Sequence, residues 1–125
     1  MSFKLLMIIK AVVCLTLGTI ILVAPEFLYS IFGTTLAAGG VFAAREYGAS
    51  LFGNMLVTWF ARKAAASEAR KAIILGLCVY DAIGFIVTLI ATIAGVLNPL
   101  GWLVVVLYLF FAVAFGYFYV KPPKP

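Results

Sequence analysis

The sequence predicts an all-α fold, a four-helix transmembrane bundle with a short interfacial helix after the first span. Of its 125 residues, 66% are hydrophobic and 10% are charged, whereas soluble domains are about half apolar and about a quarter charged. A chain this short cannot bury so many apolar side chains in one core surrounded by water. The composition therefore argues against a soluble enzyme, a disordered tail and a nucleic-acid-binding domain.

Four apolar runs form the predicted spans of a single integral membrane domain that covers residues 1–125. The runs cover approximately residues 5–23, 36–61, 72–97 and 100–120. Each has about 19 to 26 residues, and about 20 helical residues cross a hydrocarbon core of about 30 Å. Since lipid offers no hydrogen-bond partner to the backbone, we expect each run to be helical.

The first run is expected to be a retained span rather than a cleaved secretory signal. Lys10 interrupts it, and it ends at Val23-Ala24-Pro25 without the small-residue pattern of a cleavage site. After it, Pro25 and Glu26 are typical of a helix start, and apolar residues recur at helical spacing up to Gly33. We predict a short helix lying at the outer face of the membrane. The alternative is a plain loop packed on the bundle.

Lysine and arginine residues outside the apolar runs predict the orientation of the chain. They fall before the first run, between the second and third, and after the fourth: Lys4, Arg62, Lys63, Arg70, Lys71, Lys121 and Lys124. The connections 24–35 and 98–99 contain none. Because basic residues favour the cytoplasmic side, both termini are expected to be cytoplasmic. The net charge of +5 is then an orientation signal, and no nucleic-acid partner is expected.

Four charged residues lie inside the predicted spans: Lys10, Arg45, Glu46 and Asp81. Each costs about 2.5–3.5 kcal/mol near a helix centre, so they should face inward and find partners. From the rise per residue, Asp81 lies about 13 Å and Lys10 about 8 Å from the cytoplasmic boundary. A Lys10–Asp81 ion pair is therefore the simplest arrangement. The competing arrangement joins Arg45 to Asp81 and leaves Lys10 to extend toward the interface.

Polar and small residues recur on the second and third spans. In the second span, Ser50 and Asn54 follow Glu46 at intervals of four residues. With the other charges they form the predicted polar network: Lys10, Arg45, Glu46, Ser50, Asn54 and Asp81. Small residues, which let helices approach closely, mark the expected packing positions: Gly40, Ala44, Gly48, Gly53 and Gly84. We therefore expect the second and third spans at the centre of the bundle.

Motifs for catalysis are absent from the sequence. There is no histidine, and Cys14 and Cys78 lie singly within apolar runs, where thiols behave as small hydrophobic groups. The chain also lacks a phosphate-binding glycine loop and a nucleophile elbow. We therefore predict no catalytic residue, no metal site and no cofactor, and we expect the protein not to be an enzyme.

One stretch of the chain resembles a known group of membrane proteins. It begins at Pro25, continues with Arg45-Glu46-Tyr47-Gly48 and Gly53, and closes with Trp59-Phe60-Ala61-Arg62. In these residues the chain is similar to small four-helix bacterial membrane proteins of the DoxX group. The resemblance implies a bacterial inner-membrane location and a packing and pocket element at Arg45, Gly48 and Gly53. Some DoxX-like proteins are associated with quinone-linked sulfur oxidation, but this chain has no redox cysteine pair.

Two interpretations of the polar network lead to two expected functions. The favoured interpretation is a neutralised network that specifies packing or contact with a partner, in an accessory or scaffolding subunit of a larger membrane complex. The alternative is a polar intramembrane pocket, in a small membrane carrier or a lipid- or quinone-binding protein. Expected partners are membrane lipids together with other membrane subunits or further copies of the chain.

Overall fold

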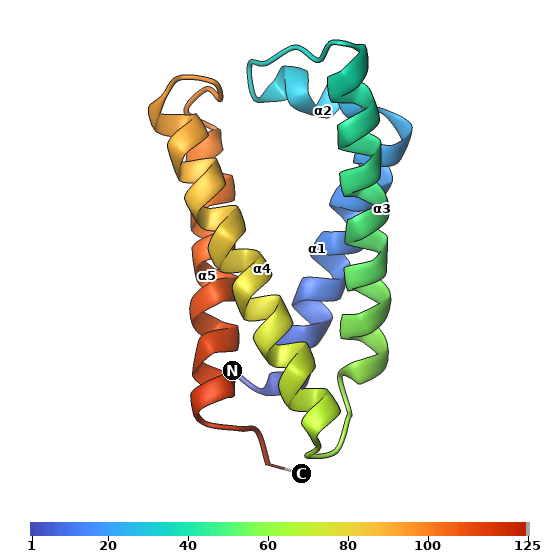
Figure 1. Ribbon diagram of the computed structural model, residues 1–125, viewed down its shortest axis with the longest axis vertical. Helices are drawn as coiled ribbons and strands as arrows, with labels where there is room; N and C mark the ends of the chain where they lie inside the picture. The colour runs from blue at the N-terminus through green and yellow to red at the C-terminus, as the bar shows by residue number, and fades with distance from the viewer. Residues whose placement is uncertain (125) are drawn as a thin grey trace.

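The computed structural model describes residues 1–124, which form five helices and no strand. The prediction of an all-α fold is confirmed. In chain order the helices are α1 (Phe3–Val23), α2 (Pro25–Ile31), α3 (Ala38–Ala61), α4 (Glu68–Ile93) and α5 (Gly101–Val120) (Figure 1). The short helix predicted after the first run is α2, which begins at Pro25 because proline fits the first position of a helix.

Helix ends depart from the apolar runs where local chemistry decides them. The α4 helix begins at Glu68, four residues before the predicted span, because the Ser67 hydroxyl accepts a hydrogen bond from the backbone N–H of Arg70. It ends at Ile93 rather than near Leu97. Gly95 adopts a φ of 79°, the left-handed conformation that terminates many helices. The helix of the third span therefore ends four residues before the predicted boundary at residue 97.

The long helices pack as two pairs, α1 with α3 and α4 with α5. The expectation that the second and third spans, here α3 and α4, form the centre is therefore wrong. Glycines explain the first pair, because a Cβ at Gly48 would stand 3.2 Å from the carbonyl oxygen of Gly18. The missing side chains let the two backbones approach closely. In the second pair, Gly84 accommodates the ring of Tyr108.

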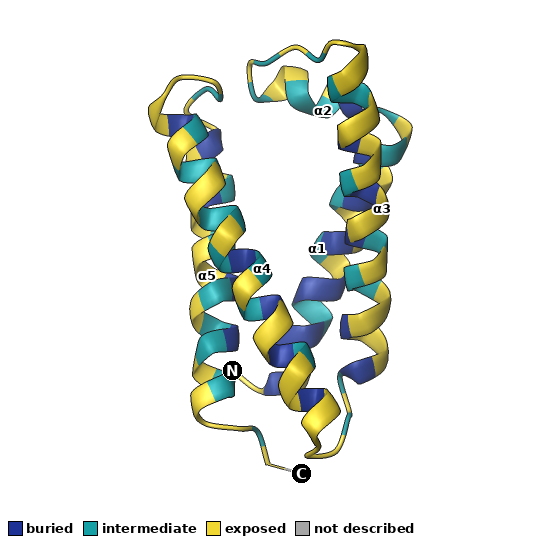
Figure 2. Ribbon diagram, in the orientation of Figure 1, coloured by how far each residue is buried: buried dark blue, intermediate teal, exposed yellow. Residues whose placement is uncertain are grey.

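The two pairs meet at one end of the molecule, which we call the convergent end (Figure 1). Its core takes residues from all four long helices: Phe3, Leu6, Met7, Ala61, Ile74, Leu77, Phe111 and Phe115. Figure 2 shows buried positions gathered where the pairs meet. The buried Arg70 guanidinium closes this end, since it donates hydrogen bonds to the carbonyl oxygens of Ala64 (3.1 Å) and Pro123 (2.6 Å).

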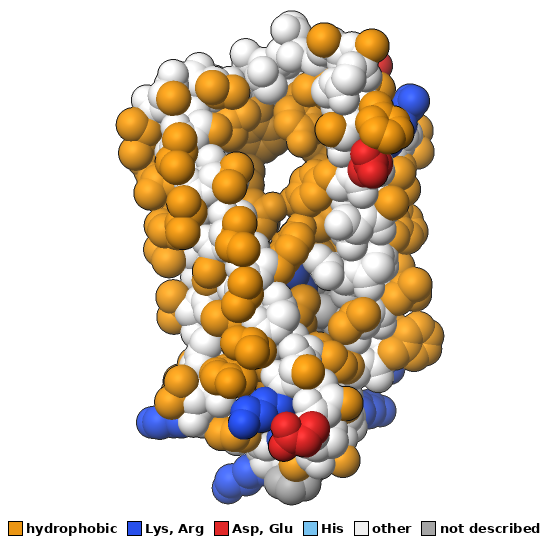
Figure 3. Space-filling model, in the orientation of Figure 1, with side chains coloured by type: hydrophobic (Ala, Val, Ile, Leu, Met, Phe, Trp, Pro, Cys, Tyr) orange, Lys and Arg blue, Asp and Glu red, His pale blue; other side chains and the backbone are white. Residues whose placement is uncertain are grey.

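Toward α2 the pairs separate, and we call this half the divergent end. Figure 3 shows an opening between the pairs there, walled by hydrophobic side chains, which we call the cleft. At the end of the cleft that is farther from the convergent end, the α4–α5 loop contacts the segment after α2. The backbone N–H of Asn98 donates to the Phe32 carbonyl oxygen at 2.8 Å, and its side-chain amide donates to the Ile31 carbonyl oxygen at 2.9 Å. The cleft is thus bounded at both ends.

Three of the described helices, α1, α4 and α5, are long and apolar enough to cross a membrane. This finding is compatible with a multi-pass membrane protein. The α3 helix has 24 residues but is less apolar, because it carries Arg45, Glu46, Ser50 and Asn54 as well as several glycines.

Candidate intramembrane polar site

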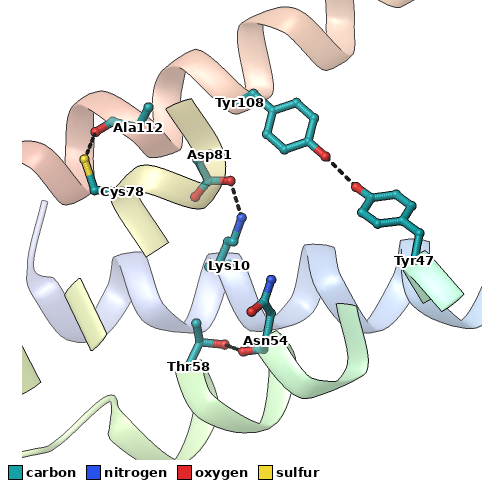
Figure 4. A network of polar contacts seen from close by, with 8 residues as sticks. All are labelled: Lys10, Tyr47, Asn54, Thr58, Cys78, Asp81, Tyr108 and Ala112. Atoms are coloured by element: carbon teal, nitrogen blue, oxygen red, sulfur yellow. Dashed lines mark hydrogen bonds and ion pairs between the residues drawn. The ribbon is translucent and has the colours of Figure 1, made fainter. Parts of the chain in front are cut away.

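An ion pair between α1 and α4 forms the centre of the candidate site. The Lys10 ammonium lies 2.5 Å from Asp81 Oδ1, and the two residues are only 3% and 0% exposed. The pairing that the estimated depths favoured is therefore present, and the competing Arg45–Asp81 pairing is not formed. Figure 4 shows the pair between the two helices. Because Lys10 is in α1 and Asp81 is in α4, the ion pair links one helix pair to the other.

Aromatic rings complete the surroundings of the Lys10 ammonium. Its nitrogen lies 4.5 Å from the centre of the Phe111 ring and 5.1 Å from the centre of the Tyr80 ring. The electron-rich faces of such rings attract a cation most strongly where water is excluded. The buried ammonium is therefore stabilised by one carboxylate and two rings, contributed by α4 and α5.

Three tyrosines lie beside the ion pair. The hydroxyl groups of Tyr47 in α3 and Tyr108 in α5 are 2.5 Å apart, so they bridge the two helix pairs (Figure 4). The Tyr80 and Tyr108 ring centres are 6.3 Å apart. None of the three is among the predicted site residues. A signal was present, since Tyr80 adjoins Asp81 and Tyr108 places a hydroxyl in mid-span, away from the interfaces where tyrosines usually gather.

Two polar atoms of this site have no hydrogen-bond partner within residues 1–124. They are the hydroxyl oxygen of Tyr80 and the second carboxylate oxygen, Oδ2, of Asp81, both buried. Both residues line a cavity of about 40 Å³, together with Lys10, Cys14, Tyr47 and Tyr108. A cavity of this size has room for ordered water. A hydroxyl can donate and a carboxylate oxygen can accept, so these two buried atoms are complementary partners for a polar group that reaches them.

The other four residues of the predicted network lie elsewhere. Arg45, Glu46 and Ser50 are exposed on α3. Asn54 is half-buried, and its backbone carbonyl oxygen accepts a hydrogen bond from the Thr58 hydroxyl at 2.8 Å. The prediction that all six polar residues form one inward-facing network is therefore wrong. The reason is the α1–α3 contact, which buries the face of Ala44, Gly48 and Leu51 and turns the Glu46 face away.

Some of the predicted packing positions contact another helix and others do not. Ala44 and Gly48 are buried against α1, and Gly84 lies against the Tyr108 ring. A side chain at Gly40 would meet only Leu36, in the segment just before its own helix, and one at Gly53 would meet nothing within 4 Å. Gly40 and Gly53 therefore do not pack against another helix of this chain.

The described residues contain no group of His, Cys, Asp and Glu that could hold a metal ion. Cys14 and Cys78 are free thiols, and Cys78 donates a weak hydrogen bond to the Ala112 carbonyl oxygen at 3.4 Å. The fold and the site define an all-helical protein that has long apolar helices and a buried polar centre between two helix pairs. No family model, curated protein or solved structure matches the chain.

Proposed function

We propose that the protein is a four-span bacterial inner-membrane protein with both termini in the cytoplasm. The 24 residues of α3 extend about 36 Å at 1.5 Å per residue, enough to cross the hydrocarbon core, and α3 runs beside α1. Lys4, Lys63 and Lys71 all lie toward the convergent end, which supports a cytoplasmic position for that end. In this placement α2 lies at the outer interface.

Labelling of single cysteines tests this placement. In a variant without Cys14 and Cys78, a cysteine at Thr34 should react with a membrane-impermeant maleimide from outside the cell. A cysteine at Ala65, in the α3–α4 loop, should react only after the membrane is permeabilised. Reaction of both from the same side would contradict four spans.

We propose further that the protein binds a small amphipathic membrane molecule, such as a lipid or a quinone, in the cleft. The observation that carries this proposal is the pair of unpartnered buried groups, the Tyr80 hydroxyl and Asp81 Oδ2, beside the apolar cleft. Buried polar groups almost always have partners, and the exceptions often mark functional sites. A polar head bonded to these groups with an apolar tail in the cleft satisfies both surfaces.

The chemistry of the site suits a head that contains carbonyl or hydroxyl oxygens. The Tyr80 hydroxyl donates to a carbonyl oxygen, and Asp81 Oδ2 accepts from a hydroxyl. The cavity of about 40 Å³ holds only a water-sized group. A larger head therefore requires the two helix pairs to separate at the Tyr47–Tyr108 bridge. Binding is thus coupled to a movement of one pair against the other.

Analysis of co-purified molecules tests this proposal. The protein is purified from its membranes in a mild detergent, extracted with organic solvent, and its lipids and quinones are quantified by mass spectrometry against the whole membrane. We expect one class to be enriched in the wild type. Tyr80→Phe should reduce that enrichment about fivefold, since a hydrogen bond contributes about 1 kcal/mol. Tyr117→Phe, which alters an exposed tyrosine, serves as the matched control.

Two results would contradict ligand binding. The first is a bound-lipid composition identical to that of the whole membrane. The second is an enrichment that Tyr80→Phe and Tyr117→Phe reduce equally, because the enriched molecule would then lie outside the cleft.

A second candidate function is that of an accessory or scaffolding subunit in a larger membrane complex. The observation that favours it is the exposure of Arg45 and Glu46 on α3, because charges inside a span usually face protein rather than lipid. Mass spectrometry of the intact particle from gentle detergent distinguishes the two. A stoichiometric foreign subunit supports the accessory function, and its absence contradicts it.

A further inference from the structure

The α3 helix has two opposite faces of different character. One face, with Ala44 and Gly48, is buried against α1. The opposite face is exposed and contains Glu46, Ala49 and Gly53, and a Cβ built at Gly53 meets nothing within 4 Å. The same face also carries the exposed rings of Phe42 and Phe60, so another helix can approach closely only along the stretch of small residues between them.

Two opposite charges flank this exposed face. Glu46 lies eight residues after the start of α3, about 12 Å along the helix, which places it inside the hydrocarbon layer under the proposed topology. Neither Glu46 nor Arg45 forms an ion pair with any other described residue. Adjacent residues project about 100° apart on a helix, so the two cannot neutralise each other across one face. Figure 3 shows acidic and basic side chains exposed on the α3 side of the molecule.

We propose that this face is the contact surface of a homodimer, in which Arg45 of each copy pairs with Glu46 of the partner subunit. At 100° per residue, Ala49 and Gly53 lie near the centre of the face, with Arg45 on one flank and Glu46 on the other. Two copies inserted in the same orientation are related by a two-fold axis along the membrane normal. Such an axis sets the left flank of one helix against the right flank of its partner.

The charge pattern argues for a second copy of this chain over a foreign protein. The face carries one cation and one anion on opposite flanks. A two-fold axis therefore creates two equivalent ion pairs, each between Arg45 of one copy and Glu46 of the other. A foreign subunit would have to supply an anion and a cation at matching positions, whereas a second copy supplies both. This inference requires α3 to lie in the membrane, but it does not depend on the ligand proposed for the cleft. The cleft lies between the two helix pairs, whereas this face of α3 points away from α1 and away from the cleft.

Disulfide crosslinking in native membranes tests the position of the contact. In a chain with Cys14→Ala and Cys78→Ala, a cysteine is introduced by Ala49→Cys, or by Val87→Cys on the exposed side of α4 as the matched control. On mild oxidation we expect Ala49→Cys to form a covalent homodimer and Val87→Cys to stay largely monomeric. Equal crosslinking of the two variants, or a disulfide from Ala49→Cys to a different protein, overturns the proposal.

Charge reversal tests the ion pairs themselves. Glu46→Arg places cations on both flanks, and we expect dimerisation in lipid nanodiscs to weaken about tenfold or more, since it removes partners from desolvated charges. The double variant Arg45→Glu with Glu46→Arg exchanges the flanks and should restore the dimer. Glu46→Gln, which keeps the shape of the side chain, provides a milder variant should Glu46→Arg not fold. Failure of the double variant to restore the dimer, with the fold intact, overturns the pairing.

Discussion

The convergent and divergent ends of the molecule use different residues for different tasks. At the convergent end, large apolar side chains from four helices, such as Leu6, Phe111 and Phe115, fill the space between the pairs. At the divergent end, the core cluster of Cys14, Ile21, Ala44 and Leu51 comes only from α1 and α3. From the other pair, the partly buried Tyr80 packs against this cluster and the Tyr108 hydroxyl meets that of Tyr47, but no fully buried side chain joins it. The comparison shows that one end supplies rigidity while the other leaves room between helices.

Removing a large side chain from the convergent core should have the largest effect on stability. Phe115 is fully buried, and Phe115→Ala should lower the free energy of unfolding by about 3–5 kcal/mol, because the cavity cannot close completely. Denaturation in mixed detergent micelles measures the change. Phe110→Ala, at an exposed position of the same helix, should have a much smaller effect. Equal losses would show that the convergent core does not carry the stability.

The ion pair at the boundary between the two ends should show the next largest effect. Asp81→Asn leaves the buried Lys10 ammonium without a counter-charge and should cost about 3 kcal/mol of unfolding free energy. The double variant Lys10→Met with Asp81→Leu should recover much of that loss, since no buried charge remains. If the loss of stability in the double variant equals the sum of the losses in Lys10→Met and Asp81→Leu alone, the two residues do not act as a pair.

Two glycines of α4 should differ in how far they tolerate an added methyl group, with a smaller effect on stability. Gly84 faces the Tyr108 ring, whereas Gly76 has open space around it. Gly84→Ala should cost about 1–3 kcal/mol, because the added methyl group must displace the ring, and it should also disturb the Tyr47–Tyr108 bridge. Gly76→Ala should leave stability unchanged or slightly raised. Thermal unfolding of the two variants side by side provides the measurement.

The smallest expected effect concerns the contact that closes the cleft. Asn98→Ala removes the side-chain hydrogen bond to the Ile31 carbonyl oxygen and the one that Asn98 Oδ1 accepts from the backbone N–H of Leu100. Because both bonds are exposed to solvent, the loss should be about 1 kcal/mol. Hydrogen exchange should rise in the segment after α2, around residues 32–34, while exchange in α1 near Leu6 stays unchanged. Increased exchange throughout the chain would instead indicate that the two ends unfold together.

Much of this fold was predictable because hydropathy and helix-capping chemistry act locally. The Lys10–Asp81 pair was predictable for a related reason, since two costly charges at similar depth have few other ways to be satisfied. The pairing of helices was not, because α3 has small residues on both faces and sequence spacing does not say which face meets α1. The tyrosines were missed because an uncharged hydroxyl costs far less in a span than a charge, so it gives a weaker signal.

Each helix pair is continuous in sequence, and this has a consequence for how the chain is made. The α1–α3 half is complete before α4 is synthesised, and domains made first generally fold first. Lys10 and Asp81, however, are separated by 71 positions. During synthesis the N-terminal half therefore holds an ammonium group whose counter-ion has not yet been translated. Asp81 arrives with α4, before α5 has been made, so Lys10 gains its counter-ion before the second helix pair is complete.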